Sequence, residues 1–252
     1  MANKRVIARI DVKNEFAIKG IQLEGLRKVG DPNEMAIKYY HEGADEIIFM
    51  DAVAAYYDRN SLSELILKAT ENVFIPITVG GGIRTIQDIS SALKSGADKV
   101  AINTQATKDP SFITKSASIF GSQCIVGSIE AKKIHNNKWE VFVDNGREPT
   151  GIDVIDWVKK LEVLGVGEII LTSIDKEGTK KGFDLDLIKA VSEEIQVPLI
   201  VCGGAGNYTH IENVLAQKFV DGIAIASVLH YNLLQINNLK LDLYNKNIKV
   251  RI

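Results

Sequence analysis

The chain alternates between short apolar runs and longer amphipathic stretches. Eight of the apolar runs are nearly continuous, as expected for strands that are buried on both faces of a parallel sheet. Residues in half-exposed antiparallel strands would instead alternate between apolar and polar. The pattern therefore predicts eight buried strands, at residues 5–11, 46–51, 75–80, 99–103, 124–130, 168–173, 198–203 and 222–227.

The stretches between these runs carry the start and stop signals of helices. In "DPNEMAIKYYHEG", Asp31 is a suitable N-cap, Pro32 suits the first turn and Gly43 suits the end. "TIQDISSALKSG" begins with a capping threonine, and "GIDVIDWVKKLEVLG" ends on a glycine. Strands that alternate with helices over 252 residues predict a single α/β domain, residues 1–252, folded as a (β/α)8 TIM barrel. A doubly wound open sheet would show the same alternation.

An internal repeat separates these two folds. "VGGGIR" and "CGGAGN" lie 123 positions apart, as do "VAINT" and "IAIAS". "DEIIFMDAV" and "GEIILTSID" are 122 apart, and "IARID" and "VGSIE" are 119 apart. Four matched segments in one order predict a barrel made of two fused (β/α)4 half-barrels, residues 1–122 and 123–252.

Composition adds little to this picture. The chain is 46% hydrophobic and 25% charged, with a formal net charge of −2, which does not indicate a nucleic-acid or membrane partner. We expect a cytoplasmic protein without a signal peptide or a membrane-spanning segment. Two cysteines in apolar runs and four scattered histidines show no ligand spacing, so we expect no disulfide, no metal and no cofactor.

Residues that suit phosphate binding gather at the carboxyl ends of the predicted strands, where barrel enzymes form their active sites. Glycine lets backbone N–H groups approach an anion closely. Glycine also permits tight turns, but two such clusters at repeat-related positions favour two phosphate sites and a bisphosphorylated small-molecule substrate. The candidate ligands are Gly81, Gly82, Asn103 and Thr104 in the first half, and Thr172, Glu177, Gly178, Gly203, Gly204, Ala226 and Ser227 in the second.

Two carboxylates occupy matching positions between these clusters. Asp11 ends the first predicted strand and Glu130 ends the fifth. A pair of carboxylates at a barrel opening suits general acid–base catalysis. Each alone also fits a structural role, Asp11 as a loop cap and Glu130 as an ion-pair partner of Lys132 or Lys19. Their repeat-related placement favours catalysis.

Motifs specific to one enzyme family run through nearly the whole chain. They include "IARIDVK", "GDPNEMAIKY", "EGADEIIF", "FIPITVGGGIR", "GADKVAINT", "FGSQCIV", "PTGIDVIDW", "LTSIDKEGTKKGFD" and "GGAGN". With them the chain resembles the cyclase subunit of imidazole glycerol phosphate synthase, the HisF family of histidine biosynthesis. The resemblance implies a lyase that combines phosphoribulosyl-formimino-aminoimidazole carboxamide ribonucleotide with ammonia. The products would be imidazole glycerol phosphate and aminoimidazole carboxamide ribonucleotide.

The resemblance also implies a partner and further site residues. Asp11 matches the first catalytic aspartate of the family, and Lys19, which we expect to bind substrate, matches its lysine after the first strand. Ammonia would come from a HisH-type glutaminase subunit on the N-terminal face of the barrel and would pass through the interior. The residues that match the charged gate at that face are Arg5, Glu46, Lys99 and Glu168. A salt-bridge cluster that serves only stability would have the same composition.

Two connections after predicted strands are unusually long. Residues 12–30 form a loop that contains Lys19 and Gly20, and we expect it to be a mobile lid, although a disordered loop would have the same sequence. Residues 132–151 predict a polar hairpin with its turn at Asn136 and Asn137.

The chain departs from the family at two carboxylates. The family has aspartate where this chain has Glu130, and Glu177 replaces another aspartate. Glutamate reaches roughly 1.5 Å farther, and a misplacement of about 1 Å can cost on the order of 100-fold in rate. The runs "VGSI" and "VCGGAG" also resemble HisF-like paralogues that deliver ammonia to an amidotransferase for surface-polysaccharide sugars without cyclising. We favour a working cyclase, with that paralogue as the alternative.

Overall fold

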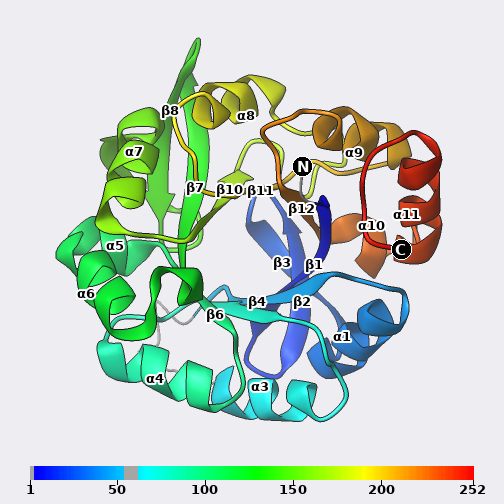
Figure 1. Cartoon of the computed structure of the whole chain (residues 1–252), viewed down its shortest axis with the longest axis horizontal. Helices are drawn as coiled ribbons and strands as arrows, with labels where there is room; N and C mark the ends of the chain where they lie inside the picture. The colour runs from blue at the N-terminus through cyan, green and yellow to red at the C-terminus, as the bar shows by residue number, and fades with distance from the viewer. Residues whose placement is uncertain (1–2, 54–61) are drawn as a thin grey trace.

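The computed structural model describes residues 3–53 and 62–252. Its centre is a closed barrel of parallel strands inside a ring of helices (Figure 1). The sheet closes because β12 pairs with β1, with Arg5 beside Gly222. The barrel strands are β1 (Arg5–Lys13), β4 (Glu46–Asp51), β5 (Ile77–Gly80), β6 (Lys99–Ile102), β7 (Ile125–His135), β10 (Glu168–Ser173), β11 (Leu199–Cys202) and β12 (Gly222–Ile225). The predicted TIM barrel is confirmed, and the open sheet is excluded.

The three helices whose capping signals were described above have those caps in the structure. Asp31 accepts hydrogen bonds from two backbone N–H groups at the start of α1, Thr85 forms a capping box, and Gly165 ends α7 with φ of 99°. The helices of the described ranges are α1 (Pro32–His41), α3 (Leu62–Thr70), α4 (Ile86–Lys94), α5 (Thr104–Lys108), α6 (Ser111–Phe120), the 3-10 helix η1 (Ser122–Cys124), α7 (Val154–Leu164), α8 (Leu185–Ser192), α9 (Tyr208–Leu215), α10 (Ser227–His230) and α11 (Ile236–Asn245). None of them is both long enough and apolar enough to cross a membrane.

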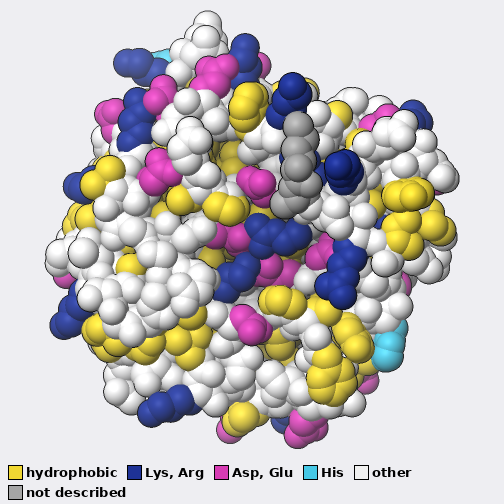
Figure 2. Space-filling view, viewed as in Figure 1, with side chains coloured by type: hydrophobic (Ala, Val, Ile, Leu, Met, Phe, Trp, Pro, Cys, Tyr) yellow, Lys and Arg dark blue, Asp and Glu magenta, His cyan; other side chains and the backbone are white. Residues whose placement is uncertain are grey.

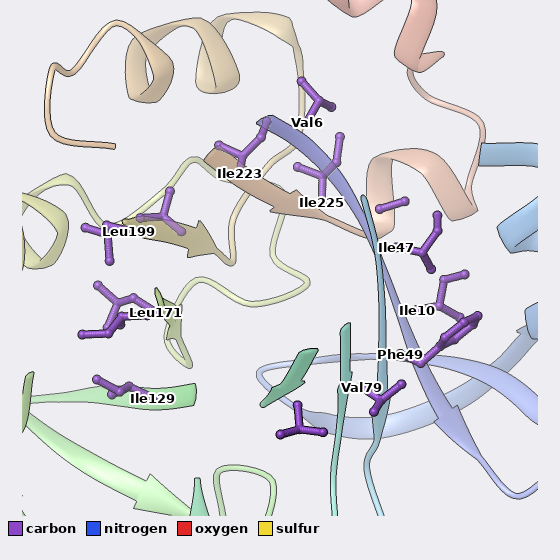
Figure 3. Packing of buried hydrophobic residues seen from close by; sticks show 14 of the residues in the cluster. Val6, Ile10, Ile47, Phe49, Val79, Ile129, Leu171, Leu199, Ile223 and Ile225 are labelled. Atoms are coloured by element: carbon purple, nitrogen blue, oxygen red, sulfur yellow. The ribbon is translucent and has the colours of Figure 1, made fainter. Parts of the chain in front are cut away.

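Side chains of the barrel strands form two separate apolar layers. Residues such as Val6, Ile10 and Phe49 point outward and pack beneath the helices (Figure 3). Alternate residues, among them Ile7 and Ile48, form a smaller cluster on the other face of the strands, inside the barrel. Burial on both faces explains why the strands read as continuous apolar runs.

Two β-hairpins extend the barrel at its C-terminal end. β1 continues into β2 (Phe16–Ile21) and β3 (Glu24–Gly30), and β7 continues into β8 (Lys138–Val143) and β9 (Glu148–Asp153). Each half of the chain therefore begins with a barrel strand, a hairpin and a helix. Figure 1 shows β7 and β8 extending beyond the ring of helices, whereas β2 and β3 lie within it.

The hairpin after β7 confirms the sequence prediction, with its turn at Asn136 and Asn137. The expectation of a loop at residues 12–30 was wrong, because residues 16–30 form the β2–β3 hairpin. Its turn places Gln22 and Leu23 at φ of 52° and 63°, which is the geometry of a tight hairpin turn. Neither residue is the Asn, Asp or Gly that usually marks such a turn, so the sequence carried no signal for it.

Candidate functional site

The two candidate catalytic carboxylates lie at the C-terminal end of the barrel. Asp11 and Glu130 are 6% and 7% exposed. Each lies where its strand leaves the barrel, because Asp11 pairs with Ile18 of β2 and Glu130 pairs with Phe142 of β8. The strands thus fix both backbones from two sides.

Two cations hold Asp11. Arg9 donates from Nε to Oδ1 at 2.8 Å, and Lys19 donates from Nζ to Oδ2 at 2.9 Å. Burial alone would raise the pKa of Asp11, but the charges of Arg9 and Lys19 outweigh burial and hold the pKa well below its usual value. Asp11 is therefore ionised across the physiological range.

Glu130 has a different environment. Its Oε2 accepts hydrogen bonds from Asn103 Nδ2 at 3.2 Å and from the backbone N–H of Gly146 at 2.8 Å. Burial raises the pKa of Glu130 to about 7, although Arg9 opposes this. Within the described residues no lysine or arginine forms an ion pair with Glu130, so the structural role that pairs it with Lys132 or Lys19 is not found. At rest near neutral pH, Glu130 can therefore carry a proton, whereas Asp11 is ionised.

Lys19 bridges the first hairpin and the loop after β10. Its ammonium group bonds to Glu177 as well as to Asp11, and both Lys19 and Glu177 are buried. Burial lowers the pKa of Lys19, but the two carboxylates outweigh it and raise the pKa above its usual value. Beside this contact, the backbone N–H of Gln22 donates to the carbonyl of Glu177 at 2.7 Å, and Leu23 packs with the residues of a small apolar cluster. The hairpin is therefore docked over the barrel opening.

The first predicted phosphate cluster lines one cavity, which has about 790 Å³ of empty space including open solvent. Asn103 gives its amide N–H to Glu130 and to the carbonyl of Phe142, and its Oδ1 is buried without a partner among the described residues. The Thr104 hydroxyl donates to Asp144 Oδ1 at 3.2 Å. Lining residues that the sequence also predicted are Gly81, Gly82, Asn103, Thr104 and Glu130.

The second predicted cluster lines a smaller cavity of about 230 Å³. Its predicted members are Glu177, Gly178, Gly203, Gly204, Ala226 and Ser227. A neighbouring cavity shares two of them and adds the basic side chains of Lys19, Arg27 and Lys180. Thr172 lines neither cavity, because it is buried in the barrel and its hydroxyl accepts a hydrogen bond from Arg9 Nη1 at 3.0 Å.

Repeat-related glycines shape the two cavities. Gly81 and Gly204 have φ of 93° and 106°. A Cβ would lie 2.3 Å from the carbonyl oxygen of Asp51 at the first position and 2.1 Å from that of Gly182 at the second. Both the backbone conformation and the close backbone contact therefore require glycine, in addition to any role in binding an anion.

The four candidate gate residues form a closed ring at the strand starts. Arg5 donates to Glu46 at 3.2 Å and to Glu168 at 2.5 Å. Lys99 donates to Glu46 at 2.9 Å and to Glu168 at 3.2 Å. Burial lowers the pKa of Arg5, but the carboxylates outweigh it and raise the pKa. Figure 2 shows basic and acidic side chains together at the centre of this face.

The sequence reasoning missed Arg9. This residue is 2% exposed, bonds to Asp11 and lines the first cavity. A signal was present, because a cation inside the apolar run "VIARID" lies two positions before Asp11 and must share its face of the strand. Other charged residues of the first cavity that were not predicted are Asp51, Arg84, Lys108 and Asp144.

Comparisons with known proteins identify the family of the chain. A family model described as "Histidine biosynthesis protein" matches residues 5–235. The imidazole glycerol phosphate synthase subunit HisF of Legionella pneumophila is 60% identical over 206 residues, which covers 82% of this chain and 97% of that protein. The protein of the same name from Bacillus cereus (strain Q1) is 45% identical over 252 residues, the full length of both. The chain belongs to the HisF family.

Proposed function

We propose that this chain is the cyclase subunit of imidazole glycerol phosphate synthase. As a lyase it combines phosphoribulosyl-formimino-aminoimidazole carboxamide ribonucleotide with ammonia, and it releases imidazole glycerol phosphate and aminoimidazole carboxamide ribonucleotide. The observation that carries this proposal is the buried pair of Asp11 and Glu130 beside two repeat-related, glycine-lined cavities. A substrate with a phosphate at each end fits this arrangement.

The two carboxylates have complementary roles in this proposal. Ammonia incorporation and ring closure both require proton transfers. Asp11 is held ionised and accepts a proton, and Glu130, with a pKa raised to about 7 by burial, donates one. The polar groups of the two cavities hold the phosphates, and the β2–β3 hairpin acts as a lid that Lys19 attaches to the site.

Turnover with ammonium salt tests this function directly. The purified chain receives the bisphosphate substrate and saturating ammonium, and substrate loss is followed optically. We expect turnover in the native chain and a loss of at least about 100-fold in Asp11→Asn, because general acid–base groups contribute about that much or more. Glu130→Asp, measured alongside, is expected to keep part of the rate. No turnover in the native chain would contradict the proposal.

A glutaminase subunit is the proposed source of ammonia. We place it on the N-terminal face, where the ring of Arg5, Glu46, Lys99 and Glu168 closes the barrel. The alternative function, ammonia delivery to another enzyme, predicts glutaminase activation without product from the bisphosphate. Turnover that appears only in Glu130→Asp would favour this alternative.

The proposal also covers the domain organisation of the chain and its location in the cell. We propose a single domain built from half-barrels at residues 1–122 and 123–252, which the matching strand–hairpin–helix beginnings of the two halves support. A cytoplasmic location follows from a role in amino-acid biosynthesis.

A further inference from the structure

Arg9 is a guanidinium buried inside the barrel. The residue is 2% exposed, and it lies on the inward face of β1 among apolar neighbours such as Ile7 and Cys202. A buried cation destabilises the fold unless close partners compensate its charge, so the contacts of Arg9 decide whether it is tolerated.

The contacts of Arg9 cross the barrel. Nε donates to Asp11 on its own strand, and Nη1 donates to the hydroxyl of Thr172 on β10 at 3.0 Å. Nη1 also lies 3.5 Å from the sulfur of Cys202 on β11. Contacts on β1, β10 and β11 therefore fix the orientation of the Arg9 guanidinium. The oriented guanidinium in turn fixes the position of the Asp11 carboxylate that bonds to it.

The remaining charges around Arg9 come from other elements. Lys19 of β2 shares Asp11, Glu177 after β10 shares Lys19, and Glu130 of β7 lines the same cavity as Arg9. Without Arg9, Lys19 would be the one remaining ion-pair partner of Asp11 among the described residues. Lys19 also pairs with Glu177, so it compensates the charge of Asp11 only in part.

We propose that Arg9 is a positioning residue of the reaction, which fixes the orientation and the negative charge of Asp11 through an ion pair anchored to Thr172 across the barrel. This inference rests on the proposed function, because it assigns Asp11 its role as a proton acceptor. Arg9 acts through Asp11 and takes no part in proton transfer.

The variants Arg9→Met and Arg9→Lys test this inference. Met keeps much of the length of the arginine side chain but removes its charge. Lys keeps the charge but lacks the planar guanidinium, whose N–H groups bond to Asp11 and Thr172 together. The control is Lys240→Met, which breaks another buried ion pair, to Asp45 at 2.7 Å, away from the site. All variants are measured for ammonium-driven turnover against pH, for thermal stability and for the 13C titration of the Asp11 carboxyl.

We expect Arg9→Met to lose about 10- to 100-fold in kcat with KM changed only a few-fold, because Asp11 is misplaced rather than removed. The Asp11 carboxyl should titrate at a higher pH than in the native chain, and the acid limb of the rate profile should move in the same direction. Arg9→Lys should recover part of this shift, and Lys240→Met should show no shift.

An Asp11 titration that is unchanged in both Arg9 variants would overturn the inference, as would a rate loss with the native pH profile. If Arg9→Met does not fold, the titration of the Asp11 carboxyl in Arg9→Lys alone tests the inference. The carboxyl titration needs no turnover, so it still reports whether Arg9 controls Asp11 if the native chain proves inactive. Inactivity of the native chain would instead count against the proposed function.

Discussion

Four of the buried charged residues at the barrel opening balance one another. Arg9 and Lys19 supply two positive charges, and Asp11 and Glu177 bond to them with two negative charges. Glu130 would add a further negative charge without an ion-pair partner among the described residues. Burial therefore governs Glu130, and the fold favours its protonated form.

This imbalance predicts that Glu130→Gln stabilises the protein at alkaline pH. The native pKa is raised from 4.5 to about 7, so ionisation of Glu130 lowers stability as pH rises through this window. Above pH 7 the full loss of stability from ionising Glu130 is reached, and a pKa shift of this size corresponds to about 3 kcal/mol. Urea unfolding at pH 5 and pH 8 should show a gain for Glu130→Gln that is larger at pH 8.

A suitable control is Glu162→Gln, since that half-buried carboxylate accepts two hydrogen bonds as Glu130 does, here from the backbone N–H groups of Gln196 and Val197. Unfolding of Glu162→Gln at the same two pH values provides the reference for the comparison. A gain in Glu130→Gln that is equal at the two pH values would contradict the prediction.

The site residues differ in how far the sequence reveals them. Asp11 and Glu130 were predictable because a parallel barrel sets strand ends at one opening, so repeat-related carboxylates must meet there. The pairing of Lys19 with Glu177 was not predictable, because it depends on a hairpin that folds across the opening. Thr172 was predicted as a ligand from its strand-end position, and the structure places its hydroxyl against Arg9 instead of in a cavity.

At the scale of elements, the barrel strands were predictable and the first hairpin was not. Apolar runs locate strands that are buried on both faces, and the runs at 46–51 and 168–173 match β4 and β10 to the residue. The β2–β3 hairpin joins a half-buried strand, β2, to a mostly polar and exposed strand, β3, and contacts far away in the sequence stabilise it. Leu23 at its turn packs with Phe142 and Ile174 from the other half of the barrel.

This contact predicts that Leu23→Ala loosens the hairpin without unfolding the barrel. Hydrogen exchange measured by mass spectrometry should rise by at least about 10-fold in peptides from residues 14–30, because a buried leucine truncation costs about 2–5 kcal/mol. The barrel strands should keep their native exchange. Ile21→Ala provides the control on the same hairpin, since that side chain is 62% exposed. Equal exchange in the two variants would show that the cluster does not hold the hairpin.

At the scale of the whole molecule, the charged ring joins strands that are distant in the sequence. Arg5, Glu46, Lys99 and Glu168 come from β1, β4, β6 and β10. Glu46 is 2% exposed and Glu168 is 7% exposed, so both depend on their cations. The ring therefore contributes to closure of the barrel, whether or not it also controls entry.

We predict that Lys99→Met lowers the free energy of unfolding by about 3 kcal/mol, because the two buried carboxylates keep only one cation between them. The exposed pair of Lys159 and Glu194, at 2.8 Å, gives the control. Lys159→Met should cost much less, because solvent screens an exposed ion pair. Urea unfolding at pH 7 compares the two, and equal losses would mean that the ring adds nothing beyond an ordinary surface pair.

The β7–β8 hairpin has a consequence for how the molecule can be extended. Its outer part, residues 132–138, is exposed and projects past the helices, while its base carries Glu130 and pairs it with Phe142 (Figure 1). The exposed turn of this hairpin is therefore only a few residues along the chain from Glu130 in the candidate site. A fluorophore attached at the turn would sense ligand arrival at the carboxylate, and a domain inserted there would join the barrel without threading through its helices.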